Sequence, residues 1–222
     1  MRTLKDCLEQ YALIALEKRD KLAFLISEHT YDLDLDAGRI RFNEDIEMPF
    51  QVLGTESDNT LTWLWAWADE QTEVPPDLLR AAKQLRDWGA REGFPELTLP
   101  SLDLDQADGQ ALALIGTEVC GANSWYRDAY EGGAAYLLLY DRRIDAQPSF
   151  DLSRLSRWFL DLVFRYDLNH RNALQSYLRI KGLSPIETGG RITATLETGE
   201  SLNAEFDAAG QLKSLNNEPV GE

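Results

Sequence analysis

The chain has 222 residues, of which 44% are hydrophobic and 27% charged, and six are tryptophan. This composition excludes an intrinsically disordered chain and supplies enough apolar residues for a sizeable core. The formal net charge of −16 disfavours binding to nucleic acid and to anionic membranes, because an acidic surface repels both.

The negative charge is concentrated in one part of the chain. Residues 31–110 carry 18 acidic and 6 basic side chains, a balance of −12, whereas the last 72 residues carry 10 and 8, a balance of −2. A basic protein partner would be attracted to the first of these regions. The alternative interpretation is that the acidic surface serves solubility alone.

The N-terminal segment predicts a helix that ends near Glu28. Its apolar residues recur at steps of three, four or seven, which produces one hydrophobic stripe. The stripe consists of Leu4, Leu8, Tyr11, Ala15, Leu22 and Leu25.

Several absences in the sequence bear on location. The N-terminus lacks the apolar core of a secretory signal peptide, and its longest early apolar run, Tyr11 to Leu16, is too short to cross a bilayer. The two cysteines, Cys7 and Cys120, do not have the spacing of a metal site or a redox pair, and nothing indicates an oxidising compartment. We therefore expect a cytoplasmic protein.

Residues 31–42 predict a β-hairpin with one polar and one apolar face. A turn at Ala37-Gly38 would set aspartate opposite arginine on one face and apolar opposite apolar on the other. The predicted cross-strand pairs are Asp36 with Arg39, Leu35 with Ile40, Asp34 with Arg41, and Leu33 with Phe42. A slip of one residue would break every match.

Further strands and helices follow along the chain. Strands are predicted at 48–55 and 61–68, then a helix from Pro76 to about Gly89, a linking loop at 92–109 and a helix at 110–119. The remaining predicted elements are strands at 124–130 and 134–140, helices at 151–166 and 169–181, and a small meander from Arg191 onward. Asn169 suits a helix N-cap, and Gly182 suits a helix end.

The order of these elements predicts the fold class. Strands are grouped in hairpins rather than alternating with helices, which indicates an α+β fold with antiparallel sheet. We expect an N-terminal helix, an antiparallel meander with helices packed on it, and a C-terminal helical pair with a small β-meander. Residues 1–145 are predicted as the main domain. Residues 146–222 form the helical pair and small meander, as a separate domain or as part of the same one.

An alternating run of aspartates, Asp32, Asp34 and Asp36, resembles the start of a calcium-binding loop. Gly38 and Glu44 each come one residue too late for that loop. The predicted hairpin already accounts for all three aspartates, so we do not predict a calcium site.

No other pattern identifies catalytic chemistry. The two histidines, His29 and His170, lack companions at metal-ligand spacing, and no nucleophile motif or glycine-rich phosphate loop is present. The sequence therefore predicts no catalytic residue, no metal and no cofactor, and it favours a protein that is not an enzyme.

Three tryptophans alternate within five residues: Trp63, Trp65 and Trp67. On a strand they would share one face with Leu61, while the other face would hold only leucine and alanine. Because both faces are apolar, we predict that the row is core and reaches solvent at most near Trp67 and Asp69. The alternative is that the tryptophans line a cleft or meet a partner.

A second aromatic stretch carries Trp125 and Arg127 on one face of its predicted strand, with Tyr126 and Asp128 on the other. Arg127 is suited to bind a carboxylate or phosphate, or alternatively to pair with one of the many acidic side chains. Trp67, Trp125 and Arg127 are therefore the candidate binding residues.

The stretches T-W-L-W-A-W-A (Thr62 to Ala68) and C-G-A-N-S-W-Y-R (Cys120 to Arg127) resemble hallmarks of an uncharacterised bacterial family, a domain of unknown function. The resemblance covers about residues 20–140 and includes Leu53-Gly54. The chain departs from the pattern at Trp125, where tyrosine is expected. The resemblance implies a bacterial cytoplasmic protein, and it implies no activity, cofactor or catalytic residue.

These observations favour an acidic cytoplasmic module that binds a basic protein partner, of adaptor, chaperone-like or immunity type. The order of elements is loosely similar to that of secretion chaperones, which is an analogy of fold. The alternative is an enzyme or small-molecule binder with a cleft beside the tryptophan strand. A concave pocket with converging polar groups would favour this alternative, and a broad acidic or apolar patch would favour a protein partner. The sequence defines no oligomeric state.

Overall fold

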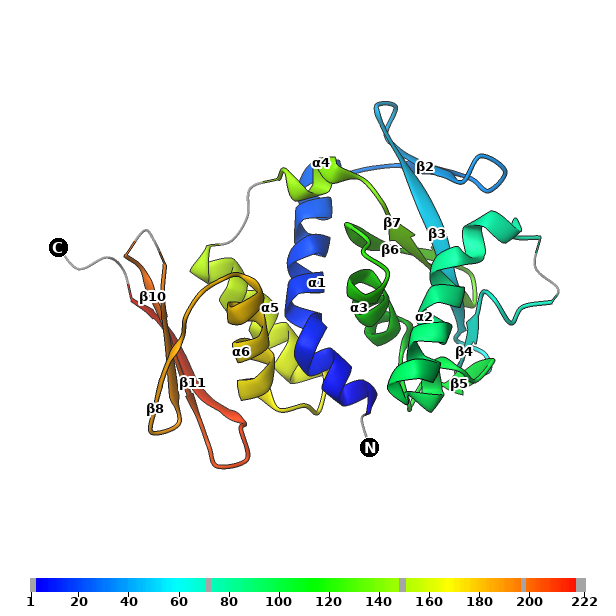
Figure 1. Ribbon diagram of the computed structural model, residues 1–222. Coiled ribbons are helices and arrows are strands. Elements are labelled where there is room, and N and C mark those ends of the chain that lie inside the picture. The colour runs from blue at the N-terminus through cyan, green and yellow to red at the C-terminus, as the bar shows by residue number, and fades with distance from the viewer. Residues whose placement is uncertain (1–2, 71–72, 148–150, 197–198, 219–222) are drawn as a thin grey trace. The chain divides into compact units, whose positions relative to one another are not determined.

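The computed structural model describes residues 3–70, 73–147, 151–196 and 199–218. The chain divides into two compact units: Met1–Leu4 with Lys18–Pro148, and Lys5–Glu17 with Ser149–Glu222. The first helix, α1 (Leu4–Ile26), therefore contributes to both units. Figure 1 follows the chain from this helix, in blue, to the last strands, in red. The predicted domains, 1–145 and 146–222, stay a prediction.

The first unit is built on one antiparallel sheet. Its strands are β1 (Tyr31–Asp34), β2 (Arg39–Phe42), β3 (Ile46–Ser57), β4 (Thr62–Trp65), β5 (Ser101–Asp103), β6 (Ser124–Tyr130) and β7 (Gly133–Leu139). They are paired in the order β1-β2-β3-β4-β5, with β7 paired to β3 and β6 to β7. The long strand β3 is the centre of this arrangement, because it pairs with β2, β4 and β7.

Helices cover one face of this sheet. Besides part of α1, the first unit contains the 3-10 helices η1 (Pro76–Leu79) and η2 (Pro95–Leu97) and the α-helices α2 (Arg80–Glu92), α3 (Gly109–Val119) and α4 (Arg142–Asp145), of which η1, α2 and α3 contact the sheet. Helices α2 and α3 both contact β3 (Figure 1). Asp108 caps α3 by accepting a hydrogen bond from the Ala111 N–H at 2.7 Å, and Gly93 ends α2 in a left-handed conformation. We call the side of the sheet that carries Trp63, Trp65 and Trp125 the helix-covered face, and the opposite side the outer face.

The hairpin β1-β2 forms with a different register from the predicted one. Asp34 pairs with Arg39 and Leu33 with Ile40, so all four predicted pairs are wrong by two positions. A shift of two residues keeps every side chain on its predicted face, because strand side chains alternate with a period of two. Aspartate still meets arginine on the exposed face, and Ile40 is buried on the other.

The turn explains the shift. Residues 35–38 form a four-residue loop in which the Asp34 carboxylate accepts a hydrogen bond from the Ala37 N–H at 2.8 Å. Gly38 supplies the positive φ of 64° that this loop requires. Leu35 therefore leaves the strand and is 37% exposed, instead of lying on the apolar face.

The region after β3 also differs from prediction at two points. Strand β4 ends at Trp65, and Trp67 lies beyond it, in a turn where the Ala68 N–H donates to the Trp65 carbonyl. The predicted loop 92–109 contains β5, which pairs with β4 through Trp63 and Leu102. This strand is three residues long, too short to produce a recognisable alternation.

The second unit combines two helices with a four-stranded meander. These elements are α5 (Leu152–Arg165), α6 (His170–Ile180), β8 (Ile186–Thr188), β9 (Arg191–Thr195), β10 (Ser201–Phe206) and β11 (Leu212–Glu218), and the strand order is β11-β10-β9-β8. The Asn169 side chain accepts a hydrogen bond from the Asn172 N–H at 3.0 Å, as predicted for the cap of α6. The buried residues of the sheet include Ile192, Ala194, Leu202, Ala204 and Phe206. The α+β class and the small C-terminal meander are thus confirmed.

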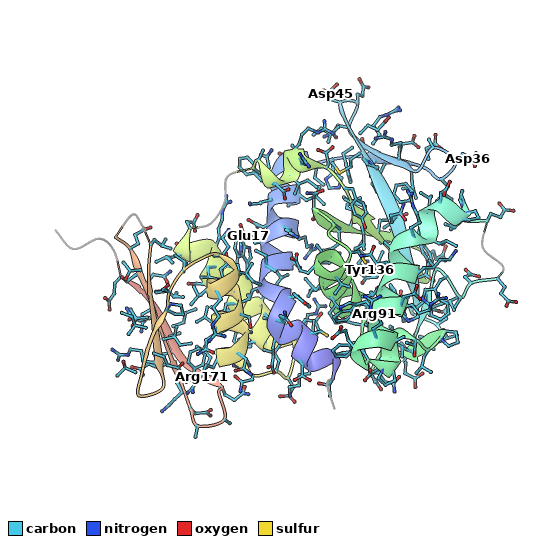
Figure 2. All side chains as sticks on the ribbon, viewed as in Figure 1. Glu17, Asp36, Asp45, Arg91, Tyr136 and Arg171 are labelled. Atoms are coloured by element: carbon cyan, nitrogen blue, oxygen red, sulfur yellow. The ribbon has the colours of Figure 1, made fainter. Side chains whose placement is uncertain are left out.

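A buried carboxylate is part of the second unit. Glu17 (Figure 2) is 1% exposed, and it accepts hydrogen bonds from the Tyr177 hydroxyl at 2.9 Å and the Lys181 ammonium at 3.0 Å. Burial, followed by the nearby charge of Glu17, raises the pKa of Tyr177. A buried charge is tolerated where donors surround it, so this cluster connects residues 5–17 of α1 to α6.

Candidate functional site

The tryptophan row is core, as predicted. Trp63 and Trp65 are both 0% exposed, and their rings meet edge to face at 5.3 Å. Trp63 also contacts the ring of Tyr136 at 5.5 Å. These two tryptophans therefore offer no surface to a ligand or partner, and a cleft beside the strand is absent at their positions.

Trp67 lies at the solvent-facing end of the row, also as predicted. It is half-buried, and the guanidinium carbon of Arg86 lies 5.2 Å from its ring centroid. A cation over an indole face is favourable and shields the ring. Arg86 also pairs with Asp87 at 2.8 Å.

Trp125 lies on the helix-covered face and is 1% exposed. Its ring stacks on Tyr136 at 5.9 Å, and the guanidinium carbon of Arg19 lies 4.7 Å from its centroid. The ring is therefore enclosed between a tyrosine and an arginine.

Arg127 pairs with an acidic side chain, which is the second of its two predicted roles. Its Nε and Nη2 atoms donate to Glu56 Oε1 at 3.1 and 2.9 Å. Glu56 is 8% exposed, and its Oε2 accepts a hydrogen bond from the Gly109 N–H at 3.3 Å. Burial and the charge of Glu56 raise the pKa of the neighbouring Tyr136, while Arg127 lowers it. This ion pair joins β3, β6 and the start of α3.

Replacing Arg127 by leucine is expected to destabilise the first unit, because Glu56 would keep its buried charge without a cation. Removing one partner of a fully buried pair costs about 3–5 kcal/mol, and we expect about 1–3 here because the arginine side chain is 41% exposed. Urea unfolding followed by tryptophan fluorescence measures this loss. The control is Arg41→Leu, which breaks an exposed pair with Glu47 and should leave the midpoint nearly unchanged. Equal midpoints for the two variants would contradict a structural role for the Arg127 pair.

The outer face carries a cluster that the sequence did not single out. Tyr31, Tyr126, Asp128 and Tyr130 gather there, and we call them the tyrosine patch. Tyr31 and Tyr130 are 40% and 51% exposed, and the rings of Tyr31 and Tyr126 meet at 5.3 Å. The Tyr31 hydroxyl donates to the Asp128 carboxylate, and this hydrogen bond is the main cause that raises the pKa of Tyr31 to about 12.

The tyrosine patch is held in place from beneath. Tyr126 contacts the fully buried ring of Phe42 at 5.1 Å and the ring of His29 at 5.8 Å. His29 Nδ1 lies 2.9 Å from the Ser27 carbonyl, which only accepts, so Nδ1 carries the hydrogen. In the neutral ring, Nε2 then accepts from the Tyr126 hydroxyl at 3.1 Å. The patch is therefore a fixed surface.

The first unit also contains a cavity of about 430 Å³ where β3 begins and β7 ends. Its apolar lining comes from Pro49, Phe50, Ala81 and Tyr140. Its polar lining comes from Gln51, Arg80, Gln84 and Cys120. The cavity is thus formed by residues other than the predicted tryptophans.

The second unit has a cavity of about 410 Å³ between the start of α1 and α6, with a mainly polar lining. Its Glu9 carboxylate already accepts from the Asn169 N–H at 2.7 Å and from Asn172 Nδ2 at 2.9 Å. Polar groups that are satisfied by the protein itself gain little from a ligand.

The described residues contain neither a cluster of metal ligands nor a helix that could span a membrane. Within 3–70, 73–147, 151–196 and 199–218, no three or more His, Cys, Asp or Glu side chains are grouped so that they could hold a metal ion. None of the helices in those ranges has the length and apolar character needed to cross a membrane. Cys7 and Cys120 are not joined in a disulfide.

Two antiparallel sheets with associated helices define an α+β protein, and its first unit contains both of the sequence motifs noted above. The chain belongs to a family of unknown function, DUF6882, whose model matches residues 5–142. The predicted resemblance to a family of unknown function is thus confirmed, and the match begins earlier in the chain than predicted. No curated protein and no solved structure matches the chain.

Proposed function

We propose that the protein is an acidic binding module whose first unit takes a positively charged segment of a partner protein. The observation that carries this proposal is the tyrosine patch, an exposed and fixed cluster that contains a carboxylate. It belongs to the more acidic part of the chain, since residues 18–148 hold 25 acidic and 12 basic side chains, a balance of −13. Opposite charge attracts such a partner and orients it.

The chemistry of the patch suits lysine and arginine side chains. Tyrosine rings attract cations through their faces, and tyrosine is enriched among residues that dominate binding energy. The pKa of Tyr130 is raised by burial and that of Tyr126 likewise, so both stay neutral phenols at physiological pH. The charge of the patch is then that of Asp128, which can form an ion pair with the cation.

The surface beside the patch supports an extended segment. Leu64 pairs with Thr55, Thr55 with Ala135, and Ala135 with Asp128, so one cross-strand row runs over four strands to the patch. All four side chains are partly exposed. A segment of the partner that follows this row would place a basic side chain against Asp128 and an apolar one against Leu64.

The test uses a fluorescently labelled lysine- and arginine-rich peptide, with binding to the full chain measured by fluorescence anisotropy. Asp128→Asn and Tyr130→Ser are each expected to weaken binding by about fivefold. Asp105→Asn, which removes an exposed carboxylate outside the patch, is the matched control and should have little effect. If the three variants weaken binding equally, overall charge alone acts and the patch is not the docking surface.

The place of action is part of the same proposal. The family resemblance implies a bacterial protein, and two cysteines that form no disulfide are compatible with a reducing cytoplasm. Fractionation of cells that produce the full chain tests this location, because recovery outside the cytoplasmic fraction would contradict it.

A further inference from the structure

We propose that the cavity at the beginning of β3 binds a small organic carboxylate with an apolar body, and that Arg80 holds its carboxylate group. This site is separate from the tyrosine patch and takes a different class of ligand. Its volume of about 430 Å³ lies within the range of pockets for small molecules, about 300–1,000 Å³.

The charge of the lining selects an anion. Among the described residues that line the cavity, Arg80 is charged and none is acidic. This contrasts with the rest of the first unit, where acidic side chains outnumber basic ones about two to one. An anion in this cavity would therefore meet a cation without a competing carboxylate in the lining.

The Arg80 guanidinium has N–H donors available to a ligand. Its Nε donates to the Asp77 carbonyl at 3.0 Å, and within the described residues its two terminal nitrogens donate to no protein atom. Those nitrogens form the fork that matches a carboxylate. The Arg80 N–H, by contrast, is held by Gln51 Oε1 at 3.1 Å, so the backbone of this residue is fixed while its guanidinium is exposed.

The neutral groups of the lining fit the rest of such a ligand. Pro49 and Tyr140, which are both partly exposed, provide apolar surface for the body of the ligand. Burial raises the pKa of Cys120 to about 12, and it is also the main cause that raises the pKa of Tyr140. Both groups are therefore uncharged at neutral pH and do not repel an anion.

The lining also argues against covalent chemistry. The Cys120 thiol donates to the Ala81 carbonyl at 3.3 Å, and a protonated thiol is a poor nucleophile. Gln51 donates to the Phe50 and Asp77 carbonyls, so its amide is occupied. The arrangement suits reversible binding.

NMR titration of the ¹⁵N-labelled full chain tests the site. Phenylacetate and hexanoate are the carboxylate probes, and phenylacetamide and hexanamide are their uncharged counterparts of nearly equal shape. We expect the carboxylates to shift the amide signals of Ala81, Cys120 and Tyr140 with millimolar dissociation constants. The amides should bind at least about fivefold more weakly, because they lack the charge that Arg80 recognises.

Two substitutions on the same helix provide the control. Arg80→Gln should reduce the affinity for phenylacetate to that for phenylacetamide, whereas Arg91→Gln, which removes an exposed cation outside the cavity, should not. Arg80→Lys keeps the charge without the fork and should give an intermediate affinity. The proposal is overturned if millimolar carboxylate leaves the three amide signals unmoved, or if Arg80→Gln and Arg91→Gln weaken binding alike.

Discussion

Trp65→Ala is expected to destroy most of the stability of the first unit. Trp65 is 0% exposed on β4, and its ring packs edge to face against Trp63. Truncating a buried tryptophan costs about 3–5 kcal/mol, against a total stability of about 5–15 kcal/mol for a typical domain. The variant should give little soluble protein, or a sharply lowered urea midpoint measured by far-UV circular dichroism.

Trp67→Ala is the matched control for that experiment. The residue comes from the same row but lies beyond the strand, half-buried under Arg86, so its loss should cost clearly less. In the unaltered protein, iodide should quench a minor part of the tryptophan emission, because Trp63, Trp65, Trp125 and Trp158 are all at most 5% exposed. Equal midpoints for the two variants would contradict the assignment of Trp65 to the core.

The sequence predicted the elements better than their register. The period of two in residues 31–42 identifies both strands and both faces, but the run D-L-D-L-D gives equally good partners after a shift of two residues. What decides between the registers is the loop, where the Asp34 side chain binds the Ala37 N–H. Such side-chain capping depends on local geometry that hydrophobic patterning does not contain.

The tyrosine patch shows a different limit. Alternation alone places Tyr126 and Asp128 on the face opposite Arg127, and this placement is confirmed. Tyr31 joins them from a position 97 residues away from Asp128 in the chain. No local pattern can reveal such a contact, because it depends on how strands distant in sequence are brought together. The cavity has the same origin, since its lining combines residues of β3 and α2 with Cys120 and Tyr140, which directly follow α3 and β7.

The candidate binding residues illustrate why residue type alone is a weak guide to a site. Trp125 is a candidate because tryptophan is enriched at interfaces, and Arg127 because its guanidinium can bind a carboxylate or phosphate. In the structure, Trp125 is enclosed by Tyr136 and Arg19, and Arg127 is engaged by a buried carboxylate. The more exposed aromatic side chains of β6 lie on the outer face of the sheet. A sequence alone cannot show which face is open, because that depends on where the helices pack.

Gly54→Ala is expected to have the second large effect, because this glycine allows two strands to fit together. A Cβ atom at position 54 would lie 2.4 Å from Cζ2 of Trp63 and 2.5 Å from the Leu64 carbonyl oxygen. Neither neighbour can move easily, since Trp63 is fully buried and the carbonyl belongs to the backbone of β4. The strand would have to shift, at a cost near the upper end of the about 1–3 kcal/mol typical of overpacking.

Gly116→Ala provides the comparison that isolates this cause. Gly116 lies in α3, and its Cβ would come no closer than 3.2 Å, to a side-chain carbon of Leu53 that can yield. Replacing glycine by alanine within a helix gains up to about 1 kcal/mol, which offsets a mild contact. We therefore expect urea midpoints near that of the unaltered protein for Gly116→Ala and far below it for Gly54→Ala. Equal stability of Gly54→Ala and Gly116→Ala would mean that Trp63 has room to move. The close packing of β3 against β4 would then not be the reason for glycine at position 54.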